Sequence, residues 1–458
     1  MRRFLAINFL LLTACATPVK YERPPVELPA AWQEGAPRFA EDGRWWRVYD
    51  DPALDKLVEE ARGKNSDLLV AAARVDEARA LLAEEQSFFF PRVDAQASAA
   101  RSRISQRNAT SFPGIPTEFS QYRAGLNVSY ELDVFGRLRA GAAAARAELE
   151  ASEASREAVR LALAAQVAKS YYALRSFDQQ VLLTRQTLEL RDEALGLQRK
   201  RFDGGVISEF ELRQLEAEAA VVRAQLPPLE SAREREEAAL SVLLGRTPKE
   251  VMESRFVLAP MEEKLAAPVL PSGMPSELLL RRPDLVAAER SLAAANARVA
   301  VARSQMFPSI SLTGSLGKES RALSDLFSGP ATAWNLVAGI TQPIFAGGRL
   351  QAETDAARAR ERAAIAQYEQ AIRNAFGEVR SALITQARAR ESFEAETARE
   401  TALEQTLRLA RLRYQNGVAS QLDVIDAERG LLAARINRID ALRNHRAAIA
   451  DLFRALGG

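Results

Sequence analysis

The sequence contains one histidine and one cysteine, and this scarcity limits the chemistry that the chain can perform. His445 and Cys15 cannot assemble a His/Cys metal cluster, a Cys–His nucleophile pair or a disulfide bond within one chain. His445 lies between Arg443 and Arg446, and we expect it to be an incidental surface side chain. Carboxylate chemistry remains possible, but the sequence favours a protein with no catalytic residue, no metal and no cofactor.

Two carboxylates near the C-terminal end, among the 60 acidic residues of the chain, are close enough in sequence to act together. Asp423 and Asp426 are three residues apart, so they share one face of a helix. They follow Ser420, a residue type that often starts a helix. Two interpretations stay open at this point. The pair is either a functional cluster of negative charge or a solvated acidic face at a helix start, where the helix dipole favours carboxylates.

Length, composition and charge restrict the classes of protein to which the chain can belong. The 458 residues are enough for two to four domains at roughly 100–200 residues each. A hydrophobic fraction of 47% with 27% charged residues fits neither a disordered chain nor a polytopic helical membrane protein. The 62 basic and 60 acidic residues nearly balance, which argues against nucleic acid as a partner.

The N-terminus has the pattern of an export signal. A positive start (residues 1–3) precedes an apolar run (residues 4–12) that is shorter than the roughly 18–20 residues needed to span a bilayer. The run ends in Leu12-Thr13-Ala14-Cys15, which resembles a bacterial lipoprotein signal. We therefore predict removal of residues 1–14 and lipidation of Cys15, with Ala16 implying sorting to the outer membrane. The alternative is a chance cysteine within a short signal.

Motifs recur in the same order in both halves of the chain, which predicts an internal two-fold structural repeat. The three motif pairs are residues 65–68 with 282–285, 136–138 with 348–350, and 201–208 with 413–420. The interval from the second motif to the third is 65 residues in both halves, since 201−136 and 413−348 are equal.

This repeat and the local composition divide the chain into five segments. They are a signal peptide (1–14), an N-terminal extended segment (15–52), a first repeat (53–245), a Pro-rich linker (246–275) and a second repeat (276–458).

Each repeat contains a stretch of alternating apolar and polar residues, which predicts one β-hairpin at 91–133 and another at 308–345. The alternating runs are long enough for the roughly 9–11 residues of a membrane-crossing strand. Four strands cannot close a transmembrane barrel, and open edges are not tolerated in lipid. If the strands enter a membrane, several chains must therefore pool them. The alternative is a soluble hairpin that packs on helices.

Each repeat also contains about 65 helix-forming residues without proline, roughly 100 Å of helix. Gly204-Gly205 and Asn416-Gly417 should end these helices, with tips near 203–208 and 415–420. Ser208 and Ser420 can cap the returning helices, and Pro227-Pro228 should interrupt or bend the first of them. Two nearly opposite apolar stripes in the first long helix suit a helix with neighbours on both sides, although a plain coiled coil remains an alternative. The stripes are Leu174, Val181, Leu188, Leu195 and Phe202, and Leu183, Leu190 and Leu197.

With these residues in view, the chain resembles the TolC family of outer-membrane efflux channels, in the lipidated branch that serves resistance-nodulation-division drug pumps. The resemblance covers nearly all of the mature chain. It implies a mainly α fold with a transmembrane β part, in which a homotrimer pools four strands per chain into a 12-stranded barrel that continues into a long periplasmic α-helical barrel. The motifs that carry it are Trp45-Trp46 with Asp51-Pro52, and residues 131–138, 275–285, 293–297, 307–308 and 343–350.

The resemblance also implies that the N-terminal segment (15–52) and the linker (246–275) lie in a belt around the middle of the helical barrel, and it implies sites and partners. The tips would meet a periplasmic adaptor protein, and Asp423 and Asp426 match the acidic constriction of the family. Some relatives hold the closed state with an Arg where this chain has Ile207 and Ala419, so its closing contacts must differ. The matching tip residues are Gly205, Val206, Ser208, Gly417, Val418 and Ser420.

The expected function is a passive exit duct in the outer membrane, energised by an inner-membrane efflux pump. We expect it to be gated by splaying of the helical hairpin tips, a change between two packings of the same helices. One alternative is the channel of a type I protein secretion system, which uses the same fold. A periplasmic coiled-coil scaffold or a carboxylate enzyme is the other.

Overall fold

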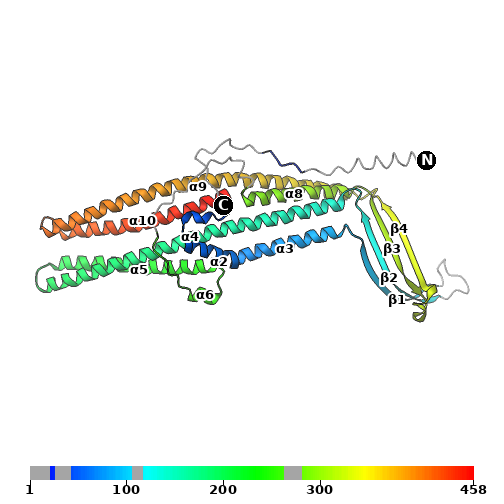
Figure 1. Cartoon of the computed structure of the whole chain (residues 1–458), viewed down its shortest axis with the longest axis horizontal. Coiled ribbons are helices and arrows are strands. Elements are labelled where there is room, and N and C mark those ends of the chain that lie inside the picture. The colour runs from blue at the N-terminus through cyan, green and yellow to red at the C-terminus, as the bar shows by residue number, and fades with distance from the viewer. Residues whose placement is uncertain (1–20, 26–42, 106–116, 262–280) are drawn as a thin grey trace. The chain divides into compact units, whose positions relative to one another are not determined.

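The computed structural model describes residues 21–25, 43–105, 117–261 and 281–458. Cys15, the signal peptide 1–14, residues 106–116 within the first predicted hairpin and linker residues 262–275 lie outside these ranges. The chain forms two compact units, and each unit draws on both halves of the sequence (Figure 1). The first unit contains Met1–Pro25, Arg74–Glu153 and Ala287–Glu369, and the second contains Val26–Ala73, Ala154–Val286 and Gln370–Gly458.

A four-stranded antiparallel sheet dominates the first unit and confirms the two predicted hairpins. The strands follow the order β1-β2-β3-β4, so the central pair β2–β3 joins the two halves of the sequence. Two short 3-10 helices, η4 (Leu323–Asp325) and η5 (Gly329–Ala331), lie between β3 and β4. The strands are β1 (Arg92–Arg103), β2 (Glu118–Leu132), β3 (Ser309–Ser320) and β4 (Thr332–Thr341).

The strand register places most of the large apolar side chains of the four strands on one face, with Phe119 and Val337 on the other. Ala95, Leu126, Leu316 and Trp334 form one row across the sheet. Because side chains alternate along a strand, the residues two positions away extend this apolar face in both directions. The Trp334 side chain is 75% exposed, and Leu336 and Ile340 are exposed to a similar degree. The alternative of a hairpin packed on helices therefore does not describe this sheet.

The outer edges of the sheet are open within the described residues. β1 pairs only with β2, and β4 pairs only with β3. Each edge presents backbone N–H and C=O groups with no strand beside them. The sheet of one chain thus has a continuous apolar face and two edges that another strand could complete.

Helices of matching length follow in both halves of the chain. α3 (Ser66–Ser87) and α8 (Pro283–Ser304) precede the two hairpins, and each has 22 residues. α4 (Arg137–Asp203) and α9 (Arg349–Gln415) follow them, and each has 67 residues, close to the predicted 65. Among the helices that the structure describes, none combines the length and the apolar character needed to cross a membrane.

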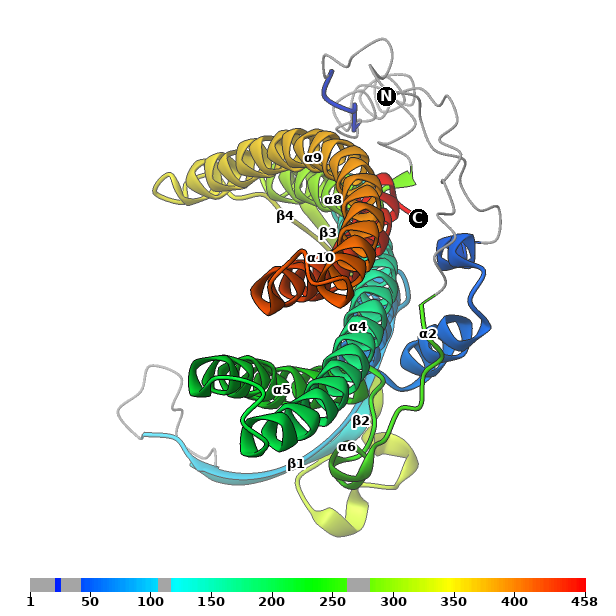
Figure 2. The same ribbon diagram turned by 90° about the vertical axis from the view of Figure 1, so that its left-hand side faces the viewer.

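Two antiparallel helical hairpins form most of the second unit (Figure 2). α5 (Glu209–Leu243) returns along α4, and α10 (Gln421–Leu456) returns along α9. Of the two outcomes predicted at Pro227-Pro228, an interruption is wrong, because α5 continues through both prolines, and a bend stays a prediction. Ion pairs to α4 lie on either side of them, Arg223 with Asp192 at 2.7 Å and Arg185 with Glu230. These contacts hold the helix where two backbone donors are missing.

In the core of the second unit, the N-terminal segment 45–64 packs against the long helices. η2 (Trp45–Tyr49) buries Trp45, which stacks on Phe453 with ring centroids 5.4 Å apart. Asp51 caps α2 (Pro52–Lys64) and also accepts a hydrogen bond of 2.9 Å from the Tyr171 hydroxyl. The Trp45-Trp46 and Asp51-Pro52 motifs therefore position this N-terminal segment. The linker contains a short helix that composition did not indicate, α6 (Pro248–Glu253), which starts at a capping box on Thr247.

His445 is buried, so its assignment as a surface side chain is wrong. Only 1% of the residue is exposed, because this face of α10 packs inward. Burial, reinforced by Arg446 and Arg390, lowers the pKa of His445 to about 4. The flanking arginines in the sequence suggested a solvated position, but α10 places its neighbours on different faces.

This burial predicts a loss of stability in mild acid. The unfolded chain binds the His445 proton below about pH 6.5 and the folded chain only below a pKa of about 4, so unfolding becomes easier as pH falls through that window. The difference between the two pKa values corresponds to a loss of roughly 3 kcal/mol in the free energy of unfolding. We expect the melting temperature of His445→Gln to fall less between pH 7 and pH 4.5 than that of the unchanged protein. An equal fall in melting temperature between pH 7 and pH 4.5 for the two proteins would contradict this prediction.

Candidate functional site

The two hairpin tips have the same backbone geometry, as the sequence predicts. Gly205 has φ 71° and Gly417 has φ 73°, a region that glycine adopts without strain. The N–H of Val206 donates to the carbonyl of Arg201 at 2.8 Å, and the N–H of Val418 donates to that of Arg413 at 2.9 Å. Both long helices therefore end in a Schellman turn.

Capping boxes start both returning helices and confirm the predicted caps. The Ser208 hydroxyl accepts from the N–H of Glu211 at 3.2 Å, and the Glu211 carboxylate accepts from the N–H of Ser208 at 2.9 Å. Ser420 and Asp423 repeat this exchange at 3.3 and 2.7 Å. The hydrogen bond from the backbone of Ser420, followed by that from its hydroxyl, lowers the pKa of Asp423. Asp423 is therefore ionised at neutral pH and also has a structural role.

Asp426 lies one turn further along α10 and projects into solvent. Its carboxylate lies 3.4 Å from the guanidinium of Arg429, and its side chain is exposed. The structure thus places both candidate carboxylates in the first turns of α10, as expected from their spacing.

Exposed apolar side chains surround both tips. Val206 and Val418 are mostly exposed, and Phe210 is 76% exposed. Phe210 and Leu422 occupy equivalent positions, since both repeats place an apolar residue two positions after the cap. Sequence reasoning missed Phe210, although comparison with Leu422 across the repeat would have found it. The tips thus present an apolar surface that a partner could cover.

A buried ionic cluster behind the tips connects the two hairpins. The Glu218 side chain on α5 is 5% exposed and lies 2.7 Å from Arg191 of α4 and 2.9 Å from Arg429 of α10. The hydrogen bond from Arg429 is the main cause that lowers the pKa of Glu218, and it outweighs burial. At the equivalent place in the second repeat, Leu403 packs against Gly430. Sequence reasoning did not identify this cluster.

A second carboxylate, which is partly buried, stands in the second repeat where the first repeat has a leucine. Glu400 on α9, at the position equivalent to Leu188, pairs with Arg435 at 3.1 Å and with Arg438. These residues border a cavity of about 250 Å³ that Leu183 and Ile439 also line. The charge at position 400 is thus satisfied inside the second unit.

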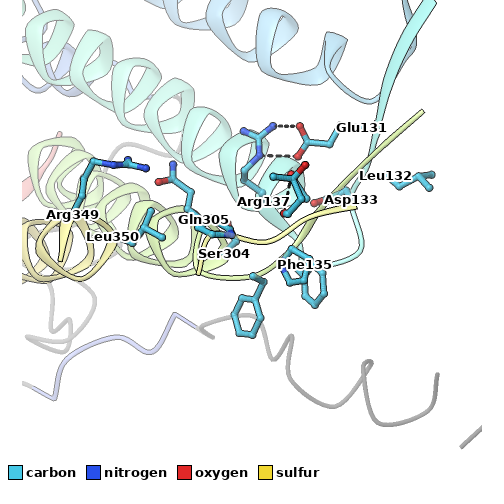
Figure 3. A pocket seen from close by; sticks show the side chains of 14 residues that line it. Glu131, Leu132, Asp133, Phe135, Arg137, Ser304, Gln305, Arg349 and Leu350 are labelled. Carbon is cyan, nitrogen blue, oxygen red and sulfur yellow. Dashed lines mark hydrogen bonds and ion pairs between the residues drawn. The ribbon is translucent and has the colours of Figure 1, made fainter. Parts of the chain in front are cut away.

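In the first unit, the residues between β2 and α4 fix the junction of sheet and helix (Figure 3). Asp133 accepts from the backbone N–H groups of Leu138 and Arg139 at 3.1 and 2.9 Å and so caps α4. Arg137 forms a bidentate pair with Glu131 at 2.9 and 2.7 Å. Phe135 stacks on Phe307, with ring centroids 5.1 Å apart, beside a cavity of about 370 Å³. The motif at 131–138 therefore has a structural role at this junction.

These features define the class of the protein. The exposed apolar face of the sheet suits lipid once further strands complete its two open edges. The two long hairpins with capped, apolar tips suit a tunnel wall. The design is that of a membrane channel that continues into a helical part.

The comparisons with known proteins identify the family within this class. The chain belongs to the outer membrane efflux protein family, whose sequence profile matches residues 57–246 and 274–458. It is similar to the toluene efflux pump outer membrane protein TtgC of Pseudomonas putida, with 33% identity over 465 residues, 99% of this chain and 94% of TtgC. The cation efflux system protein CusC of Escherichia coli O6:H1 is 32% identical over 455 residues, 98% of this chain and 96% of CusC.

A solved structure supports the same assignment. The open state of the MtrE outer membrane channel of Neisseria gonorrhoeae matches with a TM-score of 0.85 and 33% identity, over 97% of this chain and 98% of MtrE. The protein is therefore an outer-membrane efflux channel, and the family is one of transport channels. These relatives favour efflux over type I secretion, and they do not support the scaffold or enzyme alternatives.

Proposed function

We propose that the protein is the exit duct of a tripartite drug-efflux system, in which three copies pool their strands into a closed 12-stranded barrel. The observation that supports this most directly is the sheet itself. Its apolar face is exposed and its edges β1 and β4 are unpaired within the described residues, and lipid tolerates neither an open edge nor an unpaired backbone. Pairing of β4 with β1 of the next copy would complete the ring.

The long helices support assembly in the same way. Leu174, Val181 and Leu195 on α4 are buried within the chain, whereas Leu190 and Leu197 of the second stripe are exposed. An exposed leucine stripe on a helix that already packs on its other side suits contact with a neighbouring copy. We propose that these stripes form the seams of a periplasmic α-helical barrel.

We further propose that Cys15 carries the lipid anchor and that the tips bind a periplasmic adaptor protein. The exposed Val206, Phe210, Val418 and Leu422 side chains support the second proposal, since an adaptor would cover them. TtgC is named for toluene and CusC for cations, at nearly equal identity to this chain. We therefore propose that the inner-membrane pump selects the cargo and supplies the energy, while this duct is passive.

Gene deletion tests this function. A strain without the protein should become more sensitive to drugs and should still secrete its exported proteins. Loss of a secreted protein with unchanged drug sensitivity would support type I secretion instead.

We also propose that Asp423 and Asp426 form a constriction. Three copies of each carboxylate around a narrow axis would favour cations when the tips are nearly closed. Asp423→Asn combined with Asp426→Asn should reduce cation selectivity in planar-bilayer recordings. The matched control is Glu211→Gln, which alters the equivalent capping box of the first hairpin. Unchanged selectivity in the double variant, or an equal change in the control, would restrict Asp423 to its capping role.

A further inference from the structure

The apolar face of the sheet becomes charged at one end. Every second residue of a strand lies on the same face, so Val93, Ala95, Ala97 and Ala99 of β1 lead directly to Arg101 and Arg103. On the same face, β2 begins with Glu118 and β3 carries Lys318 near its end. This is the end of the sheet opposite to the starts of α4 and α9 (Figure 1).

Positive charge is in excess at this end. One carboxylate, Glu118, lies 3.3 Å from Arg101 and 3.7 Å from Arg103, and both arginine side chains remain largely exposed. The Lys318 ammonium donates to the carbonyl of Ser328 at 3.0 Å, a contact with a neutral partner. Three cations and one anion therefore leave a surplus of two positive charges on this face.

Among the strand residues that the structure describes, the excess is confined to the apolar face of the sheet. On the opposite face at the same end, Arg123 pairs with Glu319 at 3.2 Å, so those charges balance. At the other end of the apolar face, the described strands carry aliphatic residues, Val93, Leu132, Ile310 and Ile340. If the strand ends were charged only because they lie near water, both faces and both ends of the sheet would carry a similar charge, and they do not.

We propose that Arg101, Arg103 and Lys318 bind the phosphate groups of the bisphosphorylated glycolipid in the outer leaflet of the outer membrane. This inference rests on the proposed function, because it requires that the apolar face contacts lipid. The run from Val93 to Arg103 covers roughly 33 Å along the strand, which at a tilt of about 35–45° is about 25 Å of height, the thickness of the apolar band. This length brings Arg103 to headgroup level. Guanidinium groups bind phosphate oxygens in bidentate geometry, and basic residues at this level are attracted to anionic headgroups.

The test uses the full-length protein in detergent with purified lipid A carrying both phosphates. We expect the triple variant Arg101→Gln, Arg103→Gln and Lys318→Gln to bind lipid A at least tenfold more weakly, since each cation contributes about fivefold. Removing both phosphates from lipid A should weaken binding to the unchanged protein similarly. Arg123→Gln is the matched control, because this arginine lies at the same end on the opposite face, and it should bind normally. Glu118→Gln should bind more tightly.

Several outcomes would overturn the inference. They are equal binding by the triple variant, equal loss in Arg123→Gln, weaker binding in Glu118→Gln, or binding of phosphatidylglycerol as tight as that of lipid A. Bilayer conductance of each variant separates this inference from the proposed function. If the unchanged protein conducts but lipid A binding does not depend on these cations, only the lipid site is wrong. If the unchanged protein does not conduct, the duct itself is wrong.

Discussion

Replacing Leu126 by arginine is expected to prevent stable insertion of the sheet. Leu126 lies in the middle of the apolar face, in one row with Ala95, Leu316 and Trp334. An arginine near the bilayer midplane on the lipid face of a barrel costs about 2–4 kcal/mol for each chain. Assembly of several copies multiplies this cost. The expected result is little folded protein in the outer membrane fraction and a lower melting temperature in detergent.

The matched control for this prediction is one residue away. Asn127 is adjacent on β2 and lies on the opposite, polar face, where Asn127→Arg should be tolerated. Membrane yield and melting temperature measured for both variants isolate the effect of the face from that of the strand. Equal losses in the two variants would show that the apolar face does not contact lipid.

Removing the Arg429 side chain is expected to open the tips. Arg429→Ala deletes the link from α10 to the buried Glu218 of α5 and leaves Glu218 with Arg191. Allowing for the 53% exposure of the Arg429 side chain, the link contributes about 1–2 kcal/mol. If the two hairpins separate when the channel opens, this energy stabilises the closed packing alone. The open fraction should rise about 5–30-fold, which planar-bilayer conductance measures.

Arg411→Ala is the control for this prediction. Arg411 pairs with Glu428 at 2.8 Å between α9 and α10, within one hairpin, so its loss leaves the link between hairpins intact. Conductance should then stay near that of the unchanged protein. If both variants conduct alike, the pair of Glu218 and Arg429 does not hold the closed state.

The features that sequence reasoning predicted correctly depend on neighbours in the chain. Glycine at 205 and 417 ends a helix, and serine three residues later caps the next one, because both effects depend on local backbone geometry. The strands follow from alternation within short runs. The pairing of β2 with β3 joins residues about 190 positions apart, because Leu126 pairs with Leu316, and no local signal specifies it.

The features that were missed depend on packing between distant elements. His445 is adjacent to Arg446 in sequence, but the face of α10 that packs inward decides its burial. Helix α5 continues through Pro227-Pro228, and ion pairs to α4, a helix that local composition does not reveal as its neighbour, lie on both sides of the prolines. The position of Glu218 between Arg191 and Arg429 requires three helices. A charged residue in an apolar stripe, such as Glu400, indicates such a partner but does not identify it.

The account depends most on the claim that one chain cannot complete its own sheet. The decisive measurement is the mass of the detergent-extracted protein, determined together with its single-channel conductance in a planar bilayer. We predict particles with three copies of the 50.3 kDa chain, less any signal peptide removed on export, that form ion-conducting pores. Particles with one copy that stay dissolved without detergent and never conduct would contradict the account.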